Sequence, residues 1–123
     1  MTPLTCLALA LYFEARSEPL EGQIAVAEVI YNRVVDHRYP NDVCSVVYQP
    51  KQFSWTHDGL SDKPKDKQAW KKSQIVADAV MKGDLFVGHG ATHYHADYVD
   101  PYWNNSLTFV AQYGKHIFYE WEY

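Results

Sequence analysis

The pattern of hydrophobic and polar positions predicts helices in the first two thirds of the chain and strands in the last third. Residues 4–13 form an apolar run that only Thr5 interrupts, and a Thr-Pro pair precedes it. Threonine at an N-cap followed by proline is a common helix start, so we expect a buried helix over residues 4–16. Because a residue before proline is pushed out of the α conformation, Pro19 should end this helix near Ser17.

Two further helices and one short helical turn are predicted downstream. From Pro19 to about Asp36, apolar residues recur at the spacing of an amphipathic helix, at Leu20, Ile24, Ala27, Ile30 and Val34. The short turn is expected around residues 43–47. The last helix should begin at an Asp62 cap and end at Gly83, with inward side chains at Trp70, Ile75, Ala77, Ala79 and Val80.

After Gly88 the pattern changes to that of strands. The strand-like segments are THYHADYV, SLTFVAQY and HIFYEW, and DPYWNN is typical of a turn. Helices followed by a small antiparallel sheet indicate an α+β fold. We expect a single domain over residues 1–123, because no repeat or linker interrupts the pattern.

Composition and charge narrow the classes of function. The net charge is −4, whereas binding to nucleic acid needs a basic surface. The chain has no apolar stretch as long as a membrane span, and its N-terminal apolar run lacks the preceding Lys or Arg of a secretory signal. Ten Tyr, five Phe and four Trp suit a surface that stacks on sugars or bases.

The chain has two cysteines, Cys6 and Cys44. They allow a single bridge, and their spacing fits no zinc motif. Because free cysteine is among the most buried residue types, we expect two reduced thiols in the core, with one disulfide as the alternative.

The candidate chemistry begins with an acid at the end of the first predicted helix. Side chains three, four and seven positions apart lie on one side of a helix, so the face of Glu14 also carries Leu7, Ala10 and Leu11. Apolar surroundings raise the pKa of a carboxyl group, which lets it keep a proton near neutral pH and donate it to a leaving oxygen. Cleavage of a glycosidic bond needs such a donor. The alternative is a helix-end carboxylate paired with Arg16 or Arg33.

Several segments resemble the SleB/CwlJ cell wall hydrolase family, the spore-cortex-lytic enzymes and their phage and bacterial relatives. The longest is YFEARSEPLEGQIAVAEVIYNRV, and the shorter ones are QFSW, GATHYH, PYW and HIFY. One departure is Ser17, where relatives usually carry glycine. The resemblance implies a lysozyme-like catalytic domain that needs no cofactor and cuts peptidoglycan glycan strands between N-acetylmuramic acid and N-acetylglucosamine. The general acid would be the glutamate of the EA pair, here Glu14.

The resemblance leaves two chemical outcomes open. In a lytic transglycosylase one glutamate protonates the glycosidic oxygen and then takes a proton from the sugar's own hydroxyl, closing a 1,6-anhydro ring. A hydrolytic muramidase would need water activation or a second carboxylate. Of the nearby acids, Glu21 suits the first turn of a helix, and Glu28 should be solvated or pair with Asn32 or Arg33. Glu18 is therefore the acid expected to line the site.

A glycan is held by stacking on rings and by hydrogen bonds from fixed polar groups. The polar loop from Gln49 to Lys63 offers both, through Phe53, Ser54 and Trp55. The resemblance places a second wall at Thr92, His93 and Tyr94. If His93 faces the cleft, Tyr94 faces away, because side chains alternate along a strand. Weaker candidates are Tyr102, Trp103 and Tyr119.

Two other classes of function stay open. His93 and His95 would share one side of a strand and, with His89 and Asp97 or Asp100, could hold zinc in a peptidoglycan amidase or endopeptidase. A glycan-binding module without catalysis would keep the aromatic cleft but would not need Glu14.

The expected partner is the peptidoglycan glycan strand, and we expect a monomer that acts on the bacterial cell wall. Because we find no secretory signal, the chain suits either a phage endolysin released through a holin or a domain of a longer secreted protein.

Overall fold

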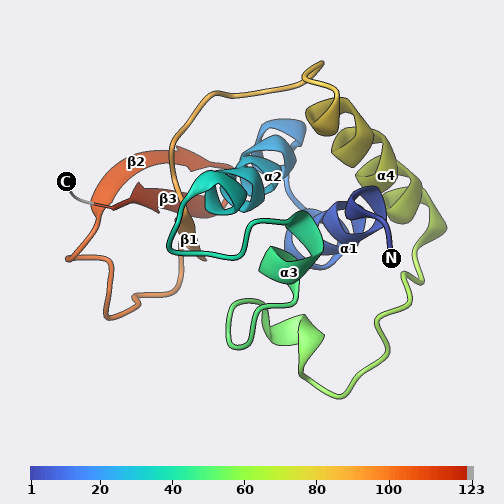
Figure 1. Cartoon of the computed structure of the whole chain (residues 1–123), viewed down its shortest axis with the longest axis horizontal. Helices are drawn as coiled ribbons and strands as arrows, with labels where there is room; N and C mark the ends of the chain where they lie inside the picture. Colours follow the sequence, from blue (N-terminus) through green and yellow to red (C-terminus); the bar gives the residue numbers. More distant parts are fainter. Residues whose placement is uncertain (122–123) are drawn as a thin grey trace.

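The computed structural model describes residues 1–121, which form helices followed by a small sheet (Figure 1). In chain order the elements are α1 (Pro3–Ala15), α2 (Leu20–Val35), α3 (Val43–Val47), the 3-10 turn η1 (Ser54–Thr56), α4 (Lys67–Met81), β1 (His93–Ala96), β2 (Thr108–Tyr113) and β3 (His116–Glu120). The strands are antiparallel in the order β1-β3-β2. The predicted α+β class is confirmed.

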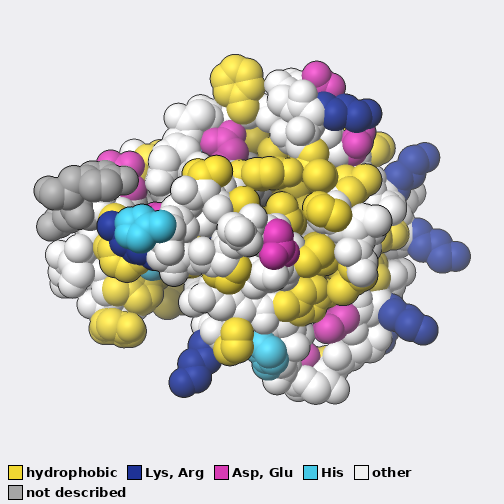
Figure 2. Space-filling view, in the orientation of Figure 1, with side chains coloured by type: hydrophobic (Ala, Val, Ile, Leu, Met, Phe, Trp, Pro, Cys, Tyr) yellow, Lys and Arg dark blue, Asp and Glu magenta, His cyan; other side chains and the backbone are white. Residues whose placement is uncertain are grey.

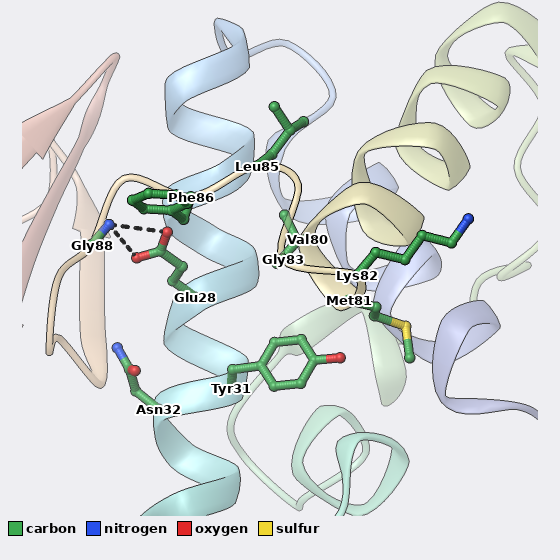
Figure 3. A pocket seen from close by; sticks show the side chains of 10 residues that line it. All are labelled: Glu28, Tyr31, Asn32, Val80, Met81, Lys82, Gly83, Leu85, Phe86 and Gly88. Carbon is green, nitrogen blue, oxygen red and sulfur yellow. Dashed lines mark hydrogen bonds between the residues drawn. The ribbon is translucent and has the colours of Figure 1, made fainter.

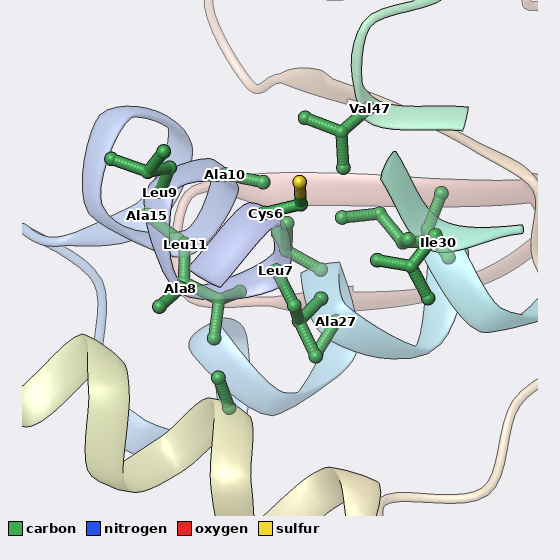
Figure 4. Packing of buried hydrophobic residues seen from close by; sticks show 14 of the residues in the cluster. Cys6, Leu7, Ala8, Leu9, Ala10, Leu11, Ala15, Ala27, Ile30 and Val47 are labelled. Carbon is green, nitrogen blue, oxygen red and sulfur yellow. The ribbon is translucent and has the colours of Figure 1, made fainter. Parts of the chain in front are cut away.

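The central element is α1, which is buried on every side instead of along one stripe. Every side chain from Cys6 to Tyr12 is buried, as expected for a helix that is apolar around its whole circumference. The helices α2, α3 and α4 surround it (Figure 1). Figure 4 shows apolar side chains filling the space between these elements. No helix in residues 1–121, α1 included, is long and apolar enough to cross a membrane.

Both ends of α1 lie where the sequence predicts them. The Oγ1 atom of Thr2 accepts the Thr5 N–H at 3.1 Å and caps the first turn. The helix ends at Ala15, and α2 begins at Leu20 directly after Pro19. Glu14 therefore lies in the last turn of a buried helix, next to a tight corner.

The predicted start of the last helix is wrong. It begins at Lys67, where the carboxylate of Asp66 accepts the Ala69 N–H at 3.1 Å. The hydroxyl group of Tyr12 accepts the backbone N–H groups of Lys65 and Asp66 at 3.1 and 3.0 Å, which holds the preceding segment outside the helix. The prediction of an inward Ile75 is also wrong, because its side chain is 59% exposed and the buried face instead carries Ser73, Val76 and Ala77.

The sheet turns one face toward the helices. Tyr94 pairs with Phe118 and Ala96 with His116, so these four side chains share a face. Phe118 is fully buried in the hydrophobic core on that side. The opposite face carries His93, His95 and Tyr119.

The expectation of two reduced thiols is wrong, because Cys6 and Cys44 form a disulfide with a Cα–Cα distance of 5.3 Å. The bridge joins α1 to α3, two elements that lie far apart in the sequence. Burial suits either a thiol or a disulfide, so only the packing of α3 on α1 separates the two outcomes.

We predict that removing this bridge with Cys6→Ala/Cys44→Ala lowers the free energy of unfolding. The bridge closes a loop between residues 38 positions apart, and such a loop restrains the unfolded chain by about 3–4 kcal/mol. Denaturant unfolding of the variant, and of the native protein with and without a thiol reductant, measures the change. Equal stability in all three samples would contradict the bridge.

Candidate active site

Glu14 lies where the buried helix α1 reaches the surface. Its side chain is partly exposed, and its Oε1 atom accepts a hydrogen bond from the hydroxyl group of Tyr94 on β1. Among residues 1–121, no ion pair joins Glu14 to Arg16 or Arg33. The Arg16 guanidinium instead lies over the ring of Tyr12, 4.6 Å from its centre. The carboxyl group is therefore not locked in an ion pair.

Burial raises the pKa of Glu14 above the usual carboxyl value, because desolvation disfavours the charged form. The hydrogen bond from Tyr94 and the positive charge of Arg33 oppose this change, since both stabilise the carboxylate. Desolvation is the largest of the three effects. Glu14 thus holds its proton to higher pH than an exposed glutamate does, which is the property of a general acid.

Arg33 supports the site from α2 without touching Glu14 through an ion pair. It is 5% exposed, and its Nε donates to the carbonyl oxygen of Thr92 at 2.8 Å. Its guanidinium lies 5.2 Å from the ring centre of Tyr39 and 5.7 Å from that of Phe53. Arg33 therefore links α2 to the segment before β1 and to the loop that carries Phe53.

Glu14 borders two pockets. One has a volume of about 460 Å³ and is lined by Pro50, Lys51, Gln52, Phe53, Ser54 and His57. The other, of about 220 Å³, lies between the α1–α2 corner and the sheet and is lined by Phe13, Arg16, Ser17, Glu18, Ala96, Tyr98, Lys115 and His116. Because both pockets include Glu14, its carboxyl group can be approached from either one.

The structure brings part of the predicted site together. Glu18, Phe53 and Ser54 line a pocket with Glu14, and Tyr94 contacts it directly. Trp55 does not line either pocket. It is 6% exposed and stacks on Phe13, with ring centres 4.9 Å apart.

The side chains of β1 alternate as expected, but the one that faces the acid is Tyr94 and not His93. Tyr94 faces Glu14, whereas the ring of His93 lies on the other face, 5.2 Å from that of Trp103. Tyr119 stacks on His95 at 5.3 Å on the same far face, and Thr92 is buried beside His93. The wall expected from Thr92, His93 and Tyr94 therefore contributes only Tyr94 to the contacts of the acid.

Several residues that line the two pockets were not singled out from the sequence. His57 belongs to the loop around QFSW, where its polar neighbours were the available signal. Tyr98, Lys115 and His116, from β3 and from the segments next to the strands, line the smaller pocket together with Glu14. Local sequence patterns carry no signal for such long-range neighbours.

The zinc alternative lacks an assembled donor set. Within residues 1–121, no three His, Cys, Asp or Glu side chains are grouped as metal ligands. The side chain of His89 is 2% exposed, with Nε2 2.9 Å from the Ala25 carbonyl oxygen and Nδ1 accepting the Ala91 N–H at 3.0 Å. His93 and His95 do share a face, but His89 lies apart from them in the core.

A third cavity, of about 500 Å³, lies between α2 and α4 and does not include Glu14 (Figure 3). Figure 2 shows hydrophobic side chains gathered on this face of the molecule. The acid in this cavity is Glu28, which is 9% exposed, so the expectation that it is solvated or pairs with Asn32 or Arg33 is wrong. Its carboxylate accepts the backbone N–H groups of Val87, Gly88 and His89 at 2.5, 2.9 and 3.0 Å. These bonds occupy the carboxylate of Glu28, so Glu14 is the better candidate for a proton donor.

Comparison with known proteins agrees with this fold. The sequence profile of the family described as cell wall hydrolase matches residues 17–119. The chain belongs to the cell wall hydrolase family. The matched span begins after Glu14, so the assignment of the acid in this cell wall hydrolase rests on the geometry above.

The solved structures that this cell wall hydrolase resembles include the catalytic domain of the germination-specific lytic transglycosylase SleB from Bacillus anthracis. That match has a TM-score of 0.76 and 32% identity, and covers 96% of this chain and 93% of the other. The catalytic domain of Bacillus cereus SleB matches with a TM-score of 0.74 and 29% identity, covering 96% and 89%. The resemblance to the SleB type and the lysozyme-like α+β fold are confirmed.

Curated relatives of this cell wall hydrolase include two spore cortex-lytic enzymes. The enzyme of Oceanobacillus iheyensis is 36% identical over 113 residues, which cover 91% of this chain and 39% of that protein. The enzyme of Bacillus subtilis is 36% identical over 114 residues, which cover 93% and 36%. The chain therefore spans well under half the length of these relatives.

We predict that Tyr94→Phe raises the pKa of Glu14 further. The substitution keeps the ring but removes the hydroxyl group whose hydrogen bond stabilises the carboxylate. Carbon-13 NMR titration of the glutamate carboxyl groups, with the Glu14 signal assigned by its loss in Glu14→Gln, measures the shift. Tyr31→Phe, on the far cavity, serves as the control and should leave this pKa unchanged. A lower pKa in Tyr94→Phe would contradict the prediction.

Proposed function

We propose that this cell wall hydrolase domain cleaves peptidoglycan glycan strands between N-acetylmuramic acid and N-acetylglucosamine, with Glu14 as the proton donor. The observation that carries the proposal is a carboxyl group with a raised pKa at the junction of two pockets. The likeness to the catalytic domain of a lytic transglycosylase supports it. Sugars on either side of the scissile bond would occupy the two pockets.

The first step is the transfer of the Glu14 proton to the glycosidic oxygen. The bond from that oxygen to the anomeric carbon breaks, the leaving sugar departs as an alcohol, and the remaining sugar carries oxocarbenium character. Glu14 is left as a carboxylate. The hydroxyl group of Tyr94 and the positive charge of Arg33 stabilise the carboxylate, so both favour the transition state in which the charge develops.

The second step completes the reaction without water. The Glu14 carboxylate takes the proton of the C6 hydroxyl group of the remaining sugar, whose oxygen bonds to the anomeric carbon and closes a 1,6-anhydro ring. The other acid in the pocket, Glu18, accepts the Lys115 N–H at 2.9 Å and has a side chain that is 8% exposed. Because Glu18 is engaged in this way, lytic transglycosylase chemistry fits the site better than activation of water by a second carboxylate.

The disulfide supports action outside the reducing cytoplasm. Disulfides persist in oxidising compartments, and this bond joins the buried Cys6 to Cys44, which packs against the core. A phage endolysin and a domain of a secreted protein both meet this condition. We expect the domain to act as a monomer, since one chain forms both pockets beside Glu14.

We predict that Glu14→Gln lowers glycan cleavage by about 10²–10⁴-fold, the usual contribution of a general acid. The variant should fold. The stability associated with the raised pKa is present at low pH and lost as pH rises through the folded-state pKa. Glu14→Gln should therefore be more stable than the native protein at neutral pH and equally stable below the ordinary carboxyl pKa. Turbidity loss of purified cell walls and thermal unfolding at two pH values measure both effects.

Glu21→Gln is the matched control for Glu14→Gln. Glu21 is an exposed acid in the first turn of α2 and lines neither pocket beside Glu14. This variant should clear cell walls at the native rate. An active Glu14→Gln protein would remove Glu14 from the mechanism.

We predict that the digestion products carry 1,6-anhydro ends. Mass spectrometry of the released muropeptides distinguishes these ends from the reducing ends that water would produce, because the two differ by one water molecule. Reducing ends alone would make the enzyme a muramidase, and cell walls that are bound but not cut would indicate a binding module.

A further inference from the structure

We propose that Glu18 is a positioning residue that fastens the sheet to the α1–α2 corner and thereby sets the hydrogen bond from Tyr94 to Glu14. The inference rests on the proposed function, in which Glu14 is the proton donor. It assigns to Glu18 neither a sugar contact nor a share in proton transfer.

The two partners of the central hydrogen bond come from separate parts of the fold. Glu14 is on α1 and Tyr94 is on β1, 80 residues away in the sequence. A hydrogen bond weakens steeply with small errors in distance and angle. The position of the sheet against the helix corner must therefore be fixed by other contacts.

Glu18 supplies such a contact. Its Oε1 atom accepts the backbone N–H of Lys115, in the turn between β2 and β3, at 2.9 Å. This bond joins positions 97 residues apart, and the Glu18 side chain is 8% exposed. A buried carboxylate that accepts a backbone N–H makes a stronger bond than a neutral acceptor does.

The turn is shaped to close on this carboxylate. Gly114 has a φ of +59°, and a Cβ at this position would lie 2.9 Å from Pro19 Cδ and 3.0 Å from Glu18 Oε1. On the other side, a Cβ on Gly22 would lie 3.1 Å from Glu18 Cβ. Gly114 thus permits an approach that a side chain would prevent, and a side chain at Gly22 would make a tight contact with Glu18.

His116 lies between Glu18 and Tyr94 and contacts both. Its Nδ1 atom lies 3.4 Å from Glu18 Oε1, and its ring centre is 4.9 Å from that of Tyr94. The ring of Phe118, which is fully buried, lies 5.5 Å from Tyr94. The Tyr94 ring is therefore in contact with both His116 and a fixed core residue.

The direction of the pKa change separates positioning from simple electrostatics. Removing the negative charge of Glu18 would by itself lower the pKa of Glu14, because one fewer anion would oppose its ionisation. Losing the hydrogen bond from Tyr94 would raise that pKa. The other charged or titratable groups that act on Glu14 or line its pockets are Arg33 from α2, Arg16 from the corner, Lys51 and His57 from the loop, Lys115 from the β2–β3 turn and His116 from β3. The substitution removes none of these charges.

The test is the carboxyl pKa of Glu14, measured by carbon-13 NMR titration of the whole domain. We expect Glu18→Ala to raise this pKa, as Tyr94→Phe does. In Glu18→Gln the side-chain oxygen can still accept the Lys115 N–H, so the pKa should not rise. The double variant Glu18→Ala/Tyr94→Phe should show no rise beyond that of Tyr94→Phe, because both changes remove the same bond.

Glu21→Ala is the control for the loss of one nearby negative charge, because Glu21 is exposed. It should not raise the pKa of Glu14. If Glu18→Ala does not fold, Glu18→Asp shortens the arm and keeps the charge, and it should also raise the pKa. A fall or no change in the variant that folds would overturn the inference. So would an equal rise in Glu18→Gln.

The titration needs no substrate. Its result can therefore contradict the role of Glu18 without contradicting the proposed function. With active protein, Glu18→Ala should lower kcat by about 10- to 100-fold, the loss expected for one hydrogen bond to a charged group. KM should stay near the native value, and Glu18→Gln should restore kcat. A change in KM alone would instead make Glu18 a substrate contact and contradict the inference.

Discussion

The carboxyl group of Glu14 is partly desolvated at the apolar end of α1, and the hydroxyl group of Tyr94 donates a hydrogen bond to it. These two effects act on its pKa in opposite directions, and desolvation is the larger. An ion pair with Arg33 would stabilise the carboxylate more strongly and lower the pKa of Glu14. Glu14 would then be ionised and would have no proton to donate. The proposed mechanism therefore needs a carboxyl group that burial keeps protonated and that a hydrogen bond stabilises once the proton has left.

The rest of the fold makes this compromise possible. A helix that is buried on every side can carry an acid only at an end, and α1 carries Glu14 in its last turn, just before the Pro19 corner. Two other buried acids have structural tasks, since Glu18 binds the β2–β3 turn and Glu28 binds the backbone of Val87, Gly88 and His89. Both carboxylates thus hold distant segments together, whereas the hydrogen bond of Glu14 comes from the hydroxyl group of Tyr94 and its side chain borders two pockets.

The two pockets beside Glu14 differ in construction. The larger is made by a loop next to η1, in which Phe53 is buried against Arg33 and the polar residues face outward. The smaller is made by elements at opposite ends of the chain, with Tyr98 85% exposed at its edge. A ring exposed to this degree offers a face for stacking on a sugar. The predicted stacking residue Trp55 cannot offer one, because it packs on Phe13 inside the core.

The sequence by itself determined the order and type of the elements and the position of Glu14 at the end of α1. The Thr-Pro start of α1, its end before the Pro19 corner and the three strands are set by local backbone preferences, which a short segment expresses alone. The position of Glu14 at the apolar helix end follows from the same periodicity. Tertiary structure decided the rest: that Tyr94 and not His93 faces the acid, that Ile75 is exposed, that Glu28 is buried and that Cys6 meets Cys44. Each of these depends on which face packs against residues distant in sequence, and a local pattern is compatible with either choice.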